Sequence, residues 1–243
     1  MPTSILRLLL LSAILLLGGC ASASHNPQDP FEGLNRGVFK FNDAVDKAVV
    51  KPVATGYKTF FPAPGRMMVS NFFSNLDDVA VAVNDLLQFK VVRAVADVGR
   101  IFVNSTVGLY GLVDVATRVG LKKNNEDFGQ TLGYWGIGSG PYLVLPMMGP
   151  STARDGVGNY ADSYLGLSKN VDDVAARNQL LAADLLDTRA RLLEKEEALG
   201  DAMLDRYSFI RDSYLQYRLN LVYDGDPPRK KYDDEEYDDG PPE

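Results

Sequence analysis

Cysteine and histidine, which often supply nucleophiles, bases and metal ligands, each occur once in these 243 residues, as Cys20 and His25. A single cysteine excludes an internal disulfide and a cysteine-rich metal site. A single histidine argues against a catalytic triad and a multi-histidine metal centre. Ser139 lies between glycines but lacks the spacing of a nucleophile elbow. The sequence therefore predicts no enzyme, no metal and no cofactor.

Three other kinds of motif resemble known functional motifs but lack the neighbouring residues that those functions require. Gly136, Gly138 and Gly140 suggest a phosphate-binding loop, but Pro141 and an apolar run follow where a helix would have to begin. The Asp-Phe-Gly sequence at 127–129 copies a kinase triplet without the other kinase motifs. Acidic clusters without the ligand spacing of a calcium loop are expected to be solvated, and they lie at 77–78, 172–173 and 233–236.

The position of Cys20 indicates a different chemistry. Residues 1–19 contain one basic residue, Arg7, and a ten-residue, largely apolar run that is too short to span a bilayer, which is typical of a signal peptide. The Leu-Gly-Gly-Cys sequence at 17–20 resembles a bacterial lipobox, which implies cleavage before Cys20 and acylation of its thiol. Ala21, in place of an aspartate, implies delivery to the outer membrane. The alternative is an ordinary signal peptide with an incidental cysteine.

Charge is concentrated at the C-terminus. The chain has 25 basic and 32 acidic residues, and 224–243 alone holds nine acids and three bases. Because this segment is also rich in proline and glycine, we expect a disordered acidic tail over 224–243. We expect a polar tether over 20–28, which includes His25, and a single folded domain over 29–223. The net charge of −7 argues against binding of nucleic acid.

Hydrophobic periodicity predicts that this domain is all-α. Asp29 and Pro30 fit the N-cap and the first position of a helix. The helix is expected to end at Lys51-Pro52, and a second short helix is expected over 53–60. The apolar stripe of the first helix favours a helix that faces the core, and it consists of Phe31, Leu34, Val38, Phe41, Val45 and Ala48.

Later segments, at 79–83, 91–103 and 107–116, are apolar around most of the helix, which is typical of a helix covered by protein or lipid. Charged residues interrupt them, so none is predicted to span a membrane. Helical periodicity returns over 172–223, with leucines at 185, 192 and 199. This pattern predicts one long amphipathic helix or two with a bend, packed on the domain, in a short coiled coil or against a partner.

Glycine and proline are frequent over 127–158, so we expect no regular helix there. The middle of this segment, 142–148, is nevertheless strongly apolar. Because an apolar loop is costly to expose to water, we expect an apolar partner to cover it.

Ten short motifs occur in order along the chain: NPQDPFE at 26–32, LNR at 34–36, FKFN at 39–42, KP at 51–52, NFFSNL at 71–76, NDLLQ at 84–88, NSTVG at 104–108, EDFGQTL at 126–132, GPYLVLP at 140–146 and GPSTARD at 149–155. A weaker echo, DRYSFIRD, lies at 205–212. Together these motifs resemble the VacJ/MlaA family of outer-membrane lipoproteins. The acidic tail lies outside the pattern.

The resemblance implies a disc-like helical domain around a lipid channel, held in the periplasmic leaflet of the outer membrane and associated with a trimeric porin. It implies removal of mislocalised phospholipid from the outer leaflet and delivery to a periplasmic carrier that serves an inner-membrane transporter. A lipid-anchored structural or assembly factor is the main alternative. A membrane-associated hydrolase is a more distant one, because no nucleophile is paired with a base.

Two sets of residues are expected to serve such a channel. We expect a hinged hairpin at its mouth over 133–149, with simple core packing of this loop as the alternative; its members are Gly133, Tyr134, Trp135, Gly140, Tyr142, Leu143, Val144, Leu145, Met147, Met148 and Gly149. A polar wall for the lipid headgroup is expected from charges inside an apolar helix, although internal ion pairs explain them as well. These charges are Arg93, Asp97 and Arg100.

Overall fold

The computed structural model describes residues 26–199 and 205–228. The expected signal peptide, Cys20, His25 and the tail beyond 228 lie outside these residues. The helices are α2 (Glu32–Val45), α3 (Lys51–Phe60), α4 (Ala63–Leu87), α5 (Val91–Thr106), α6 (Val115–Arg118), α7 (Phe128–Tyr134), α8 (Ala153–Leu165), α9 (Val174–Leu199) and α10 (Arg206–Val222). The π-helical turn η2 (Asp46–Val50) joins α2 to α3, the short 3-10 helix η3 spans Leu167–Lys169, and the hairpin consists of β1 (Tyr142–Leu145) and β2 (Gly149–Thr152).

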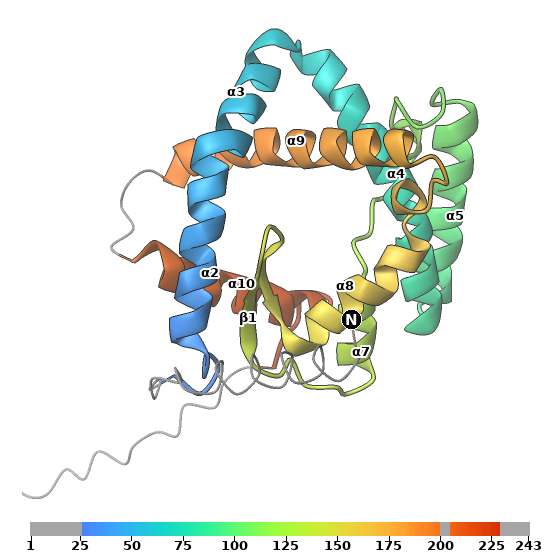
Figure 1. Ribbon diagram of the computed structural model, residues 1–243. Coiled ribbons are helices and arrows are strands. Elements are labelled where there is room, and N and C mark those ends of the chain that lie inside the picture. Colours follow the sequence, from blue (N-terminus) through green and yellow to red (C-terminus); the bar gives the residue numbers. More distant parts are fainter. Residues whose placement is uncertain (1–25, 200–204, 229–243) are drawn as a thin grey trace, which may run out of the picture.

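The helices follow one another around a ring (Figure 1). The α2 and α3 helices form one side, α9 crosses between the sides, α4 and α5 form the other side, and α7, α8 and α10 close the ring. The hairpin rises inside the ring beside α2, with which β1 is in contact. The helical fold that the sequence predicts is confirmed, and the paired strands are confined to this small hairpin in the described part of the chain.

The first helix differs from its prediction at both ends. Its N-cap is Phe31, and Asp29 is buried, where it accepts hydrogen bonds from Asn35 and Tyr207. The helix also does not end at Pro52, because η2 carries it directly into α3. Wider hydrogen-bonded turns of this kind let a helix continue past a local irregularity.

Most of the apolar stripe of α2 is not buried in a core, which corrects the prediction for this helix, although Val38 packs against the cluster of Tyr142, Val144 and Tyr207. Asn35 is the buried residue of α2, whereas Leu34 is 51% and Phe41 is 54% exposed. The leucine repeat of α9 is likewise exposed, at Leu185 and Leu192. Periodicity located these apolar faces correctly. It does not show whether a face is buried, because burial depends on the elements that pack against the helix.

The α5 helix shows most clearly which kind of side chain is buried between the helices. Its buried face carries Ala94, Asp97, Arg100 and Asn104. Its opposite face is apolar and exposed over Val91, Val95, Val98 and Phe102, with Val95 at 67% and Phe102 at 68%. The helix is therefore amphipathic with its polar face inward, which corrects the prediction that it is apolar all round.

The described chain as a whole likewise buries more polar than hydrophobic side chains. Its buried residues comprise 22 polar or charged side chains and 11 hydrophobic ones. Water-soluble proteins bury mainly apolar side chains, and charged residues enter their interiors only when paired. This domain instead holds its helices together through buried ion pairs and hydrogen bonds, and it leaves apolar faces free on the outside.

Close backbone contact fixes the crossing of α7 and α8. A Cβ added at Gly158 would lie 2.4 Å from the backbone nitrogen of Gly129, whereas one at Gly156 would meet its nearest neighbour at 3.7 Å. We expect Gly158→Ala to lower the free energy of unfolding by about 1–3 kcal/mol, as overpacking does. Gly156→Ala, two residues away on the same helix, should be neutral or slightly stabilising. Equal denaturation midpoints for the two variants would contradict this packing.

Candidate functional site: an amphipathic ring with a docked hairpin

The hairpin is shorter and later than expected. Its strands pair antiparallel from Tyr142 with Thr152 to Leu145 with Gly149. Residues 133 and 134 belong to α7 instead, because Asp127 caps that helix through the backbone N–H of Gln130. The segment 127–158 therefore does contain regular helix, at α7 and again from the start of α8, which corrects the prediction.

The expected gate residues divide into a buried root and an exposed tip. Tyr142 and Val144 are buried and pack with Tyr207 of α10, so they anchor the hairpin. Leu143 and Leu145 are half-buried. Met147 and Met148 are 59% and 76% exposed at the tip.

The glycines and aromatic residues around the hairpin have distinct settings. Gly140 and Gly149 both have a positive φ, at 65° and 86°, and lie at the two ends of the hairpin's first strand and turn. Gly133 lies against Arg154 and Val222, where a Cβ would meet side-chain atoms at 2.8 Å. Tyr134 is exposed. Trp135 is half-exposed at the end of α7, and its indole N–H donates to the Leu87 carbonyl at 3.1 Å.

Two asparagines of α2, which sequence reasoning missed, hold the free edge of β1. The Asn35 amide donates to the Tyr142 carbonyl at 3.0 Å and accepts from the Val144 N–H at 2.9 Å. The Asn42 amide repeats this pattern, donating to the Leu145 carbonyl and accepting from the Met147 N–H, both at 2.9 Å. Each side chain thus replaces a neighbouring strand for two backbone groups.

The spacing explains why one helix can do this. Seven residues of α-helix rise about 10.5 Å, and three residues of strand rise about 10 Å. Asn35 and Asn42 therefore meet the strand in register at Val144 and Met147. The signal in the sequence is a pair of asparagines seven residues apart within an otherwise apolar helix face.

The two asparagines should have separable effects. Because Asn35 is buried, Asn35→Ala leaves groups of Asp29, Tyr142 and Val144 without a partner, and we expect a loss of about 2–3 kcal/mol in unfolding free energy. Asn42→Ala should cost less than about 1 kcal/mol, because water can reach the tip. It should nevertheless speed amide hydrogen exchange at Met147. Unchanged exchange there would show that the Asn42 contacts do not restrain the tip.

The charges expected to form a polar wall take part in internal ion pairs and hydrogen bonds. Arg100 is buried and donates to Asp78 at 3.3 Å, to Thr117 at 2.9 Å and to the Leu121 carbonyl at 2.6 Å. Asp97 is buried and accepts from Asn124. Arg93 is less enclosed and pairs with Glu126 and Asp224. The alternative of internal ion pairs therefore fits Arg100 and, through the buried carboxylate of Glu126, Arg93, whereas Asp97 is held by hydrogen bonds from Asn124.

Asp224 extends the folded part beyond the expected boundary at 223. Its carboxylate lies 2.7 Å from both Lys90 and Arg93, so the first residue assigned to the tail joins α10 to the start of α5. These cations hold the pKa of Asp224 below its usual range, against burial, which acts in the opposite direction.

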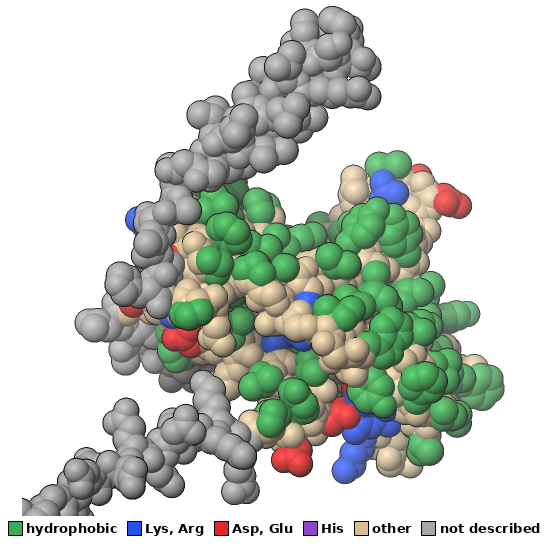
Figure 2. Space-filling view, turned by 90° about the horizontal axis from the view of Figure 1, so that it is seen from below, with side chains coloured by type: hydrophobic (Ala, Val, Ile, Leu, Met, Phe, Trp, Pro, Cys, Tyr) green, Lys and Arg blue, Asp and Glu red, His purple; other side chains and the backbone are tan. Residues whose placement is uncertain are grey.

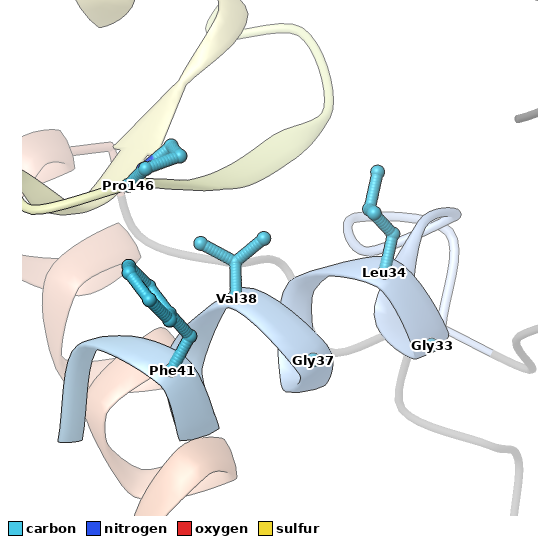
Figure 3. Close-up of a pocket in the computed structure, with 6 residues that line it drawn as sticks. All are labelled: Gly33, Leu34, Gly37, Val38, Phe41 and Pro146. Carbon is cyan, nitrogen blue, oxygen red and sulfur yellow. The ribbon is translucent and has the colours of Figure 1, made fainter. Parts of the chain in front are cut away.

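An open apolar groove runs between α2 and the hairpin tip (Figure 3). It has a volume of about 400 Å³ and is lined by Gly33, Leu34, Gly37, Val38, Phe41 and Pro146. Apolar side chains also cover much of the surface seen from below, including the part under α5 (Figure 2). No helix in the described ranges is both long and apolar enough to cross a membrane.

These features define a class: a helical protein with a polar interior and an apolar exterior, suited to lie within a lipid layer. A family model described as "MlaA lipoprotein" matches residues 27–221. The chain is 37% identical over 218 residues to the "Intermembrane phospholipid transport system lipoprotein MlaA" of Escherichia coli (strain K12), with 86% of this chain and 85% of the relative covered. The protein of the same name from Haemophilus influenzae is 31% identical over 235 residues, with 93% of each covered.

A solved structure agrees with the sequence comparisons. It comes from work described as "Structural basis for maintenance of bacterial outer membrane lipid asymmetry" and is 35% identical, with a TM-score of 0.69 over 80% of this chain and 98% of that chain. The chain belongs to the MlaA lipoprotein family. The resemblance noted from its ordered motifs is thereby confirmed.

Proposed function

We propose that this lipoprotein removes mislocalised phospholipid from the outer leaflet of the outer membrane and passes it to a periplasmic carrier protein, without chemical change to the lipid. The observation that carries this proposal is the inverted amphipathicity of α5, with exposed Val95 and Phe102 opposite buried Asp97 and Arg100. The relatives named for intermembrane phospholipid transport support the choice of cargo.

The physical problem of lipid transport fits this architecture. Moving one tail of about 16 carbons through water costs on the order of 13 kcal/mol at about 0.8 kcal/mol per methylene. A protein that lies in the leaflet gives the tail an apolar path, and polar groups that stay exposed on it can serve the headgroup. The exposed apolar side chains of α5 supply the path for the tail, whereas its buried charges are already hydrogen-bonded and hold the helices together.

We place the chain at the periplasmic side of the outer membrane, anchored by acyl chains on Cys20 and associated with a trimeric porin. The acyl anchor would hold it firmly, since several chains bind far more strongly than one. The exposed apolar residues of α5 support insertion into one leaflet. The porin and the carrier are partners that the family resemblance implies.

The decisive experiment measures outer-leaflet phospholipid in cells with a membrane-impermeant amine label. Deletion of the gene should raise the labelled phospholipid, and the wild-type chain should reverse the rise. Cys20→Ala, which removes the anchor, should fail to reverse it. No rise on deletion would favour a structural role, and release of fatty acid by the purified protein would favour a hydrolase.

The hairpin is the proposed gate, hinged at Gly140 and Gly149, whose positive φ angles disfavour any residue with a Cβ. We expect the double variant Gly140→Ala and Gly149→Ala to clear outer-leaflet phospholipid more slowly, because each alanine would cost about 1–2 kcal/mol in this conformation. Gly138→Ala is the control, since its Cβ would meet no atom within 4 Å. Clearance by the double variant at the wild-type rate would refute the gate.

A further inference from the structure

The groove beside α2 is lined by apolar residues. Leu34, Val38 and Phe41 point from the helix toward the hairpin, and Pro146 faces them from its tip (Figure 3). Asn35 and Asn42 lie on the same helix, and their amides are directed at the hairpin backbone. The groove therefore offers apolar contact and no polar partner, which selects a hydrocarbon ligand.

The groove is open on its α2 side, at Gly37. A Cβ added at Gly37 would meet no atom within 4 Å, so this glycine leaves space that a side chain would fill. Lys40 is exposed one turn further on, and among the described residues no acidic side chain pairs with it. Residues three apart on a helix are neighbours, so this cation lies beside the open edge.

From these features we infer that the groove binds one acyl chain of the transported phospholipid, with Lys40 beside its phosphate. This inference rests on the proposed function and assigns it a site. An apolar slot with the exposed cation of Lys40 at its rim complements an amphiphile that has a hydrocarbon tail and an anionic headgroup. From Gly33 to Phe41 the helix rises about 12 Å, close to the roughly 15 Å that the tails of one leaflet occupy.

The test fills the groove without disturbing the fold. Gly37→Leu places a side chain in the open space, and Gly56→Leu is its matched control, because Gly56 is a helical glycine of α3 that also has no atom within 4 Å of an added Cβ. Both variants should be at least as stable as the wild type, since glycine disfavours a helix. Phospholipid copurified with the full-length lipoprotein should fall about tenfold for Gly37→Leu, equivalent to about 1.4 kcal/mol, and stay unchanged for Gly56→Leu.

Clearance in cells separates this inference from the proposed function. If deletion raises outer-leaflet phospholipid and Gly37→Leu restores it as well as the wild type does, the groove is not the lipid site, although the transport function stands. If deletion causes no rise, the proposed function itself fails. Lys40→Gln should lower copurified phospholipid less than Gly37→Leu does, because the tail contacts remain.

Photocrosslinking identifies the occupant directly. With Val38→p-benzoylphenylalanine in the full chain, irradiation of cells should yield an adduct with phospholipid. An adduct with another protein, with a second copy of this chain or with the chain's own N-terminal segment would overturn the inference. The crosslink requires no loss of function, so it remains informative even if Gly37→Leu fails to fold.

Discussion

Replacing Arg218 with leucine is expected to cause one of the largest losses of stability of any single substitution in this chain. Its guanidinium donates to Asp155 at 2.9 and 3.0 Å and to Asp127 at 2.8 Å, which ties α10 to the N-termini of α7 and α8. Burial alone would raise the pKa of both carboxyl groups, but the arginine outweighs burial and holds each pKa below its usual range. Removal of Arg218 leaves Asp155 buried and without its main cation, which typically costs about 3–5 kcal/mol.

Denaturant unfolding of the full-length lipoprotein in detergent measures this effect. Arg206→Leu is the control, because Arg206 lies on the same helix but pairs with Asp43 and Glu196 at a more exposed position. We expect that variant to lose no more than about 1 kcal/mol. Adding Asp155→Asn to Arg218→Leu should recover part of the loss, since the unpaired charge is then gone. Equal losses for the two arginine variants would show that Arg218 does not hold the ring closed.

The sequence predicted many of the helices because helical periodicity is a property of each segment by itself. Periodicity alone locates α5, α10 and the part of α4 around 79–83, whereas the segment at 107–116, which was expected to be helical, is mostly turn before the short α6. Whether a helix face is buried or exposed is not a local property, because it depends on which side of the helix packs against the rest of the ring. The stripe of Leu34, Val38 and Phe41 has the pattern of an ordinary core-facing helix, and nothing within the stripe indicates that Leu34 and Phe41 stay exposed beside the hairpin.

The candidate site was predicted in part for a similar reason. Glycine content and the apolar run identified the hairpin, but its root could not be separated from its tip, since Tyr142 is buried by Tyr207, which lies 65 positions further along the chain. Arg100 was recognised as unusual within an apolar helix, and ion pairing was one of two explanations. Its partners Asp78 and Thr117 lie on other elements, so only the three-dimensional structure distinguishes the explanations.

Lowering the pH is expected to stabilise the domain through a second buried group, Asp85 on α4. No donor in the described structure reaches either of its carboxyl oxygens, and its closest acidic partner is Asp97 on α5. Burial, a shared hydrogen bond with Asp97 and the charge of Glu126 raise the pKa of Asp85 to about 7, against the opposing effect of Lys90. Two buried carboxyl groups can share a hydrogen bond when one of them carries a proton.

The sign of the pH dependence follows from proton binding. In the unfolded chain the pKa of an aspartate is about 3.9, so between about pH 4 and 7 the folded state holds a proton that the unfolded state has released. Stability should therefore decrease as the pH rises through this interval and level off above it.

Asp85→Asn isolates the first group. The asparagine amide can donate to Asp97 at every pH, so we expect the variant to be more stable than the wild type at pH 8, by up to about 4 kcal/mol for three pKa units. Its unfolding free energy should also fall less steeply between pH 4 and 7, with the remaining slope due to the other titratable groups. Exposed Asp172→Asn should leave the wild-type slope intact. A variant less stable than the wild type at pH 8 would mean that Asp85 is charged in the folded protein and that α4 and α5 are held together without a shared proton.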